Sequence, residues 1–167
     1  QTPLFRKAVA RLAAAPASPL TMVALPILLN GIAAYFYWGL SVALAPVIAV
    51  FFAQEAEKKG IAIDFPFFLA AITSSTAVYQ FGLSSAGPLA LATSGHFLQE
   101  ITGVVPLTRT IWSPAAILQV TLFLTAVILL AWRAMPRDHR PISVYPESAK
   151  LAMPEERVER VHVSARR

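Results

Sequence analysis

A cluster of glycine, serine and proline interrupts an otherwise apolar stretch of the chain between Gly82 and Pro88. Such a cluster is typical of a discontinuous membrane helix, in which the chain leaves the helix partway across the bilayer. The break frees backbone N–H and C=O groups, and the start of a half-helix carries partial positive charge. A carboxylate can bind there, and unwound carbonyls with hydroxyls can hold Na⁺. The cluster therefore predicts a substrate site, although the same small residues would also let helices pack closely.

Hydroxyl and imidazole side chains extend this candidate site. Ser84 and Ser85 lie inside the break, and Thr93 and His96 follow within the same apolar block. The hydroxyls are uncharged oxygens suited to Na⁺. His96 is either a proton or substrate contact or an interfacial histidine bonded to backbone. We predict seven substrate-binding residues in this block: Gly82, Ser84, Ser85, Gly87, Pro88, Thr93 and His96.

A second polar group lies in the preceding apolar block. Asn30 is the only amide there before Gln54, and an amide in lipid needs hydrogen-bond partners. It either faces the substrate cavity or makes a hydrogen bond between helices. Asn30, Trp38 and Gly39 complete the predicted substrate-binding set.

The sequence carries no pattern of an enzyme or a metal centre. It has no cysteine, and no P-loop, nucleophile elbow or HExxH helix occurs in it. His96 and Glu100 have helical spacing but lack the further ligands that a metal needs. We therefore expect no enzyme activity, no metal and no cofactor, with H⁺ or Na⁺ as the candidate coupling ion.

The composition of the chain is that of a membrane protein. It is 56% hydrophobic and 14% charged, whereas soluble domains carry about 25% charged residues. No charged residue or histidine occurs from Leu12 to Gln54. The basic residues that give the net charge of +5 flank apolar blocks, which favours contact with lipid headgroups over contact with nucleic acid. These features predict an all-α, multi-pass membrane protein.

Three regions follow from the distribution of polar residues. We predict that residues 1–18 form a cytoplasmic amphipathic or interfacial segment. Residues 19–134 should form the membrane domain, which must position the candidate site. Residues 135–167 should form a polar, largely disordered tail with a short helix near Glu155–Val161.

The first apolar block of the membrane domain, 19–53, has an unusual length. One helix over Thr21–Ala53 would be about 50 Å long against a hydrocarbon core of about 30 Å, and two spans of about 20 residues each do not fit. We therefore predict a re-entrant helical hairpin that turns inside the protein between Pro26 and Pro46.

Basic residues provide a test of this hairpin. The positive-inside tendency places three clusters in the cytoplasm. They are Arg6/Lys7/Arg11, Lys58/Lys59 and Arg133/Arg137/Arg140. A hairpin keeps all three on one side, whereas a single crossing separates them. Two tight full spans would pass the same test, so charge fixes the number of crossings as even and length favours the re-entrant form.

The remainder of the membrane domain contains one interrupted and one ordinary helix. A polar loop over Gln54–Asp64 leads into a discontinuous transmembrane helix over 65–97. A loop over Gln99–Ser113 follows on the side opposite the basic clusters. The last element is a transmembrane helix over 114–132, with Ser113 as its cap and Pro114 at its first position.

In order and spacing, these residues resemble the short-chain fatty acid transporter family of bacteria, the acetoacetate and butyrate carriers. The similarity extends from Pro19 to Arg133. The matched positions are Trp38-Gly39, Gly82-Leu83-Ser84, Pro88-Leu89, Ala92-Thr93, Gly95-His96, Val105-Pro106, Thr110 and Ser113. The chain departs from the family pattern, which has His, Gly, Gly and Ser, at Gln80, Phe81, Ser85 and Ala86.

The resemblance implies a secondary carrier, a symporter of the bacterial inner membrane with re-entrant hairpins and broken helices near its substrate. Its substrate would be a small carboxylate such as butyrate or acetoacetate. Family members are longer and have two related halves, so we expect this chain to be a fragment whose partner is the remaining half, with a homo-oligomer as a further option. The alternative function is a non-transporting membrane scaffold or assembly subunit.

Overall fold

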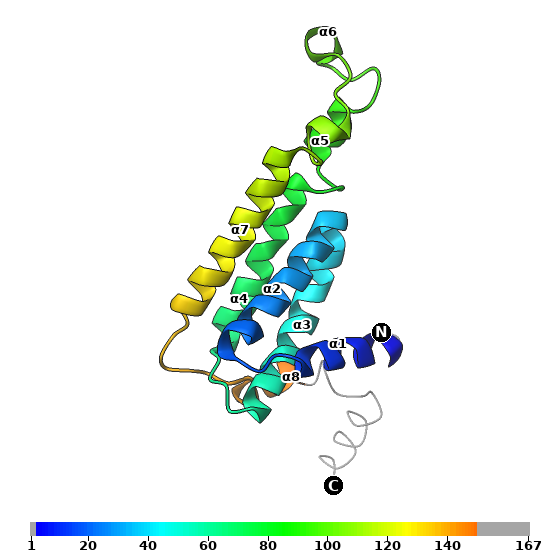
Figure 1. Cartoon of the computed structure of the whole chain (residues 1–167). Coiled ribbons are helices and arrows are strands. Elements are labelled where there is room, and N and C mark those ends of the chain that lie inside the picture. Colours follow the sequence, from blue (N-terminus) through cyan, green and yellow to red (C-terminus); the bar gives the residue numbers. More distant parts are fainter. Residues whose placement is uncertain (1–2, 150–167) are drawn as a thin grey trace.

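The computed structural model describes residues 3–149, and all regular structure within this range is helical. In chain order the elements are α1 (Pro3–Ala14), α2 (Pro19–Phe36), α3 (Trp38–Lys58), α4 (Phe65–Ser74), the 3₁₀ segment η1 (Ser75–Phe81), α5 (Ala86–Leu91), α6 (Gln99–Thr102), η2 (Leu107–Arg109), α7 (Pro114–Arg133), η3 (Ile142–Val144) and α8 (Pro146–Ala149). Figure 1 shows α2, α3, α4 with η1, and α7 as a bundle, with α1 across one end and α5 and α6 projecting from the other.

Three helices in the described part of the chain, α2, α3 and α7, are long and apolar enough to cross a membrane. Their 18, 21 and 20 residues correspond to about 27, 32 and 30 Å, close to the thickness of the hydrocarbon core. Together α4 and η1 form a fourth rod of about 29 Å. The prediction of an all-α, multi-span membrane fold is confirmed.

The first apolar block forms a helical hairpin that turns between Pro26 and Pro46, as predicted. The turn is the single residue Tyr37, whose backbone is extended (φ −157°, ψ 121°). Both helices continue through their prolines, Pro26 in α2 and Pro46 in α3, as membrane helices tolerate.

The loop predicted over Gln54–Asp64 is shorter than expected, because α3 continues to Lys58. The predicted length of the hairpin, taken over Thr21–Ala53, was therefore too short. With Pro19 and Leu20 at the start of α2 and the charged last turn of α3 included, both helices reach the length of a full span. How deeply the hairpin enters a bilayer stays a prediction.

The centre of the bundle is α2, which packs against α3, α4, η1 and α7. It begins with a capping box in which Ser18 and Thr21 exchange side-chain and backbone hydrogen bonds, with Pro19 at the first helical position. The largest fully buried apolar side chains are Phe52, Phe68, Met22, Ile27 and Ile72. In lipid such a core is held by close packing, since apolar surroundings offer no hydrophobic driving force between helices.

At the margin of the bundle lies α7, in which Ala131 is the one buried residue. Its start is as predicted, because the Ser113 hydroxyl accepts from the Ala116 N–H at 3.2 Å and Pro114 is the first residue. Six large apolar side chains face outward: Ile117, Leu118, Leu122, Leu129, Leu130 and Trp132. This surface suits lipid or further protein within the membrane.

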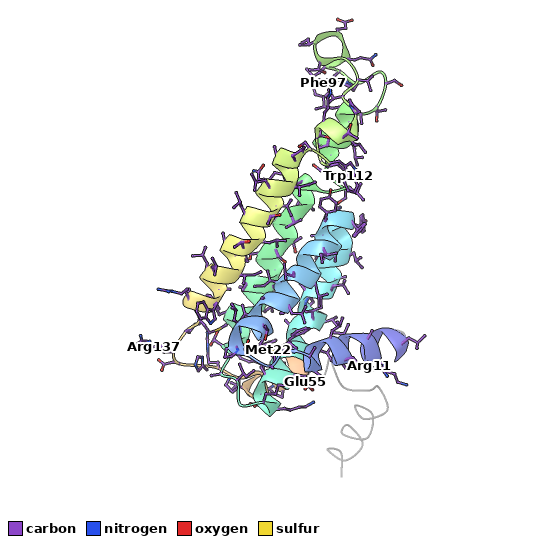
Figure 2. All side chains as sticks on the ribbon, viewed as in Figure 1. Arg11, Met22, Glu55, Phe97, Trp112 and Arg137 are labelled. Atoms are coloured by element: carbon purple, nitrogen blue, oxygen red, sulfur yellow. The ribbon has the colours of Figure 1, made fainter. Side chains whose placement is uncertain are left out.

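One end of the bundle carries basic residues from α1, the end of α3 and the segment after α7 (Figure 2). The Lys59 ammonium donates to the backbone carbonyls of Ala14 at 2.6 Å and Pro16 at 2.7 Å, which ties the end of α1 to the end of α3. Figure 2 shows Arg11 and Arg137 at this end and Trp112 toward the other. Basic residues from three segments at one end are consistent with an even number of membrane crossings between those segments.

An ion pair fastens the segment after α7 to the same end. The buried Asp64 carboxylate accepts from the Arg140 guanidinium at 2.8 Å and caps α4 through the Phe67 N–H at 3.0 Å. The hydrogen bond from Arg140 holds the pKa of the Asp64 carboxyl below its usual range, against the opposing effect of burial. The predicted tail contains two short helical segments within the described residues, η3 and α8, and the helix predicted near Glu155–Val161 lies outside the described residues.

Candidate functional site

The discontinuous helix breaks in two stages. Regular α-helix ends at Ser74 and passes directly into the 3₁₀ turns of η1. The helix then stops at Gly82, whose backbone is extended (φ −109°, ψ −174°). The predicted interruption is therefore present, but it is confined to 82–85, and the resumed helix α5 ends at Leu91, well before the expected Phe97.

The break docks against the turn of the α2–α3 hairpin. The Leu83 N–H donates to the Tyr35 carbonyl at 2.7 Å. The Ser84 hydroxyl accepts from the Trp38 N–H at 3.1 Å. Residues 35–39 and 82–85 together are called the tip junction below.

This contact explains why the hairpin turns at a tyrosine, with neither Gly nor Pro at that position. In a continuous helix the Tyr35 carbonyl would accept from the N–H of Gly39. It instead accepts from Leu83, and α3 begins again at Trp38 with Ser84 as the acceptor for its first N–H. The two interruptions satisfy each other's backbone groups, as apolar surroundings require.

Gly82 is the closest approach within the tip junction. A Cβ atom at this position would lie 2.2 Å from the Tyr35 carbonyl oxygen and 2.8 Å from the Tyr35 Cα. Since these are backbone atoms, no side-chain movement relieves the contact. Glycine is thus required here by proximity, which is one role predicted for this cluster of small residues.

Tyr35 connects the tip junction to the segment that leads into α7. Its hydroxyl donates to the Ile111 carbonyl at 3.3 Å, and its ring meets Trp112 edge-on at 5.9 Å. This role of Tyr35 was not predicted, because an aromatic residue in an apolar block gives no sign of its backbone partner.

The start of α3 brings partial positive charge to the tip junction, as the N-terminus of any helix does. The Trp38 N–H donates to the Ser84 hydroxyl, and the N–H groups of Leu40 and Ser41 donate to the Tyr37 carbonyl. Of the predicted residues, the structure therefore brings together Trp38, Gly39, Gly82, Ser84 and the buried Ser85.

Four other predicted residues lie beyond the tip junction in the projecting lobe of α5 and α6 (Figure 1). Gly87 and Pro88 belong to α5, and a Cβ at Gly87 would meet nothing within 4 Å. The Thr93 hydroxyl donates to the Leu89 carbonyl within its own turn. These contacts stay inside the lobe and add no group to the tip junction.

His96 closes a loop of this lobe. Its Nδ1 accepts from the Leu98 N–H at 3.2 Å, which leaves Nε2 to donate to the Gly103 carbonyl at 3.1 Å. The backbone-bonded alternative for this histidine matches the geometry, and its role in substrate binding stays a prediction.

Asn30 lies within α2, seven residues before the turn, and not at the tip where it was expected. Its amide nitrogen lies 3.0 Å from the Ile72 carbonyl oxygen, 3.1 Å from the Ser75 hydroxyl and 3.2 Å from the Thr76 hydroxyl. The interhelical hydrogen bond, the second of the two alternatives, is what the structure contains. Ser75 and Thr76 were not selected from the sequence, although four consecutive hydroxyl residues at 73–76 are conspicuous in an apolar block.

Spanning helices joined to an interrupted helix define the chain as part of a multi-span membrane protein. The sequence profile of the short chain fatty acid transporter family matches residues 1–167, and the chain belongs to that family. Over 143 residues it is 25% identical to a protein of Escherichia coli (strain K12) named as a candidate short-chain fatty acid transporter, with 86% of this chain and 31% of that protein covered. The chain thus spans about a third of the length of this relative. No solved structure matches it.

Proposed function

We propose that the full-length protein is a secondary transporter of short-chain fatty acids such as butyrate and acetoacetate, and that it works as a symporter in the bacterial inner membrane. Membership of the family and the three candidate spans support this proposal. The observation that carries it is the tip junction, where two interrupted helical segments meet. The remaining half of the protein would complete the transport path.

The proposed ligand contact is between the substrate carboxylate and the start of α3. A hydroxyl oxygen that accepts one hydrogen bond still carries a proton to donate. The Ser84 hydroxyl, which accepts from the Trp38 N–H, would donate that proton to the carboxylate. The partial positive charge at the start of α3 would favour the same anion, and the half-exposed Trp38 ring would contact its short alkyl chain.

The same geometry suits release of the substrate. Across the tip junction, the Leu83–Tyr35 and Trp38–Ser84 hydrogen bonds join the two segments. A relative movement of hairpin and broken helix would exchange these bonds for bonds to the carboxylate or to water. We infer that this exchange opens and closes the site.

Uptake of labelled butyrate by cells that make the full-length protein tests this function. Loss of a hydrogen bond to a charged group costs about 1.5–3 kcal/mol, so Ser84→Ala should raise KM about tenfold or more. Ser94→Ala is the matched control, because Ser94 is exposed in the projecting lobe. Equal uptake kinetics in the two variants would remove the tip junction from the substrate path, and an inert full-length protein would favour a scaffold.

A further inference from the structure

The polar cluster around Asn30 takes no part in the tip junction. Asn30 and Ser75 are fully buried, and Thr76 is partly buried beside them. The three oxygens of Ile72, Ser75 and Thr76 surround the Asn30 amide nitrogen at 3.0–3.2 Å. This arrangement is a cluster of uncharged oxygens inside an apolar bundle, gathered around an N–H donor group.

Hydrogen bonding in this cluster is unbalanced. The amide has two protons to share among three acceptors, and the Ile72 carbonyl also accepts the Ser75 hydroxyl at 2.7 Å. The Asn30 Oδ1, on the other side of the amide, is buried without a hydrogen-bond partner. An orphaned buried acceptor is costly, and the hydrogen bonds of the amide nitrogen between helices do not account for it.

We propose that this cluster is a Na⁺ site in which Asn30 is the movable ligand. Na⁺ would bind between these oxygens and the amide, which would shift back to make room for the ion and rotate so that Oδ1 faces it as the fourth oxygen ligand. The other three ligands would be the Ile72 carbonyl and the hydroxyls of Ser75 and Thr76, whose protons would point away from the ion. The orphaned Oδ1 thereby acquires a partner.

The composition of the cluster favours a monovalent ion. Divalent Ca²⁺ and Mg²⁺ sites use carboxylates, and the described residues contain no group of three or more His, Cys, Asp or Glu residues that would hold a metal. Neutral oxygens at an irregular helix are the ligands that membrane carriers offer to Na⁺. The change from α to 3₁₀ geometry at Ser75 supplies that irregularity, and mid-helix 3₁₀ segments often mark hinges.

The position of the cluster would link the ion to the substrate, an extension that rests on the proposed function. Asn30 lies five residues before Tyr35 on α2, and Thr76 lies six residues before Gly82 at the end of η1. An ion held between α2 and η1 would therefore fix the relative position of the two segments that form the tip junction. Binding of Na⁺ would favour the closed junction and hence the bound carboxylate.

The test uses the purified full-length protein in vesicles, with choline as the replacement for Na⁺ at constant pH. Thr76→Val removes one ligand oxygen while keeping the shape of the side chain. It should raise the Na⁺ concentration for half-maximal butyrate uptake about tenfold or more, as the loss of about 1.4 kcal/mol does. Thr73→Val is the matched control, because that hydroxyl is exposed and donates to the Leu69 carbonyl.

Thermal stability in the absence of butyrate separates this proposal from the function on which it rests. Na⁺ should raise the melting temperature of the wild type and of Thr73→Val, and the shift should be lost in Thr76→Val and Ser75→Ala. This result would support the site even if no butyrate were transported. The Na⁺ site would be overturned, and H⁺ favoured as the coupling ion, by either of two results. One is that neither uptake nor melting temperature depends on Na⁺, and the other is that Thr73→Val and Thr76→Val respond equally to Na⁺.

Discussion

Replacing Gly82 with alanine would place a methyl group in the closest contact of the tip junction. The new Cβ would lie 2.2 Å from the Tyr35 carbonyl oxygen, so the two segments must separate. Overpacking of this kind costs about 1–3 kcal/mol. Separation also breaks the Leu83–Tyr35 hydrogen bond, worth about 1 kcal/mol, and we expect a total loss of about 2–4 kcal/mol in the free energy of unfolding.

The assay is equilibrium unfolding of the full-length protein in detergent, followed by butyrate uptake in cells. Gly87→Ala is the matched control, because nothing lies within 4 Å of its Cβ position. Its helical location in α5 should make alanine neutral or stabilising by up to about 1 kcal/mol. If Gly82→Ala is as stable and as active as Gly87→Ala, the docking of the break on the hairpin turn is wrong.

Three further predictions concern the rest of the fold. Because the pKa of Asp64 is lowered in the folded protein, its carboxylate stabilises the fold above about pH 4. This stability is lost as the pH falls through the folded-state pKa. Asp64→Asn keeps a side chain that can cap α4, and its unfolding should lose this dependence on acid pH. Ser113→Ala removes the acceptor of the Ala116 N–H and should lower the free energy of unfolding by about 1 kcal/mol, whereas an unchanged stability would argue against the cap. Single cysteines at Lys58 and Arg137 should react with an impermeant maleimide from the same side of the membrane. Labelling from opposite sides would show that the number of membrane crossings between them is not even.

How much of the fold was predictable depends on the range of the interactions. The start of α7 was readable because Ser113 and Pro114 act on their own helix. The turn at Tyr37 was not, since it is fixed by Leu83 and Ser84 from more than forty positions away. The end of α3 was placed too early because charged residues mark the edge of the bilayer and still favour helix.

Residues of the candidate site could likewise be predicted where their own type gives the signal, and not where a distant contact does. Gly82 and Ser84 were identified because small and hydroxyl residues are rare in a continuous apolar helix. Tyr35 contributes a backbone carbonyl, which every residue possesses and no sequence pattern reports. Thr93 and His96 followed the break in sequence, but the chain turns away into the projecting lobe after α5 and carries them with it.

The central claim, that the tip junction holds the substrate carboxylate, is tested most directly by protection of a cysteine. In a full-length protein without other cysteines, Ser84→Cys places a thiol at the junction and Thr93→Cys places one in the exposed lobe. Butyrate should slow the reaction of the first thiol with a charged methanethiosulfonate and leave that of the second unchanged. Modification of Ser84→Cys at the same rate with and without butyrate would contradict the account.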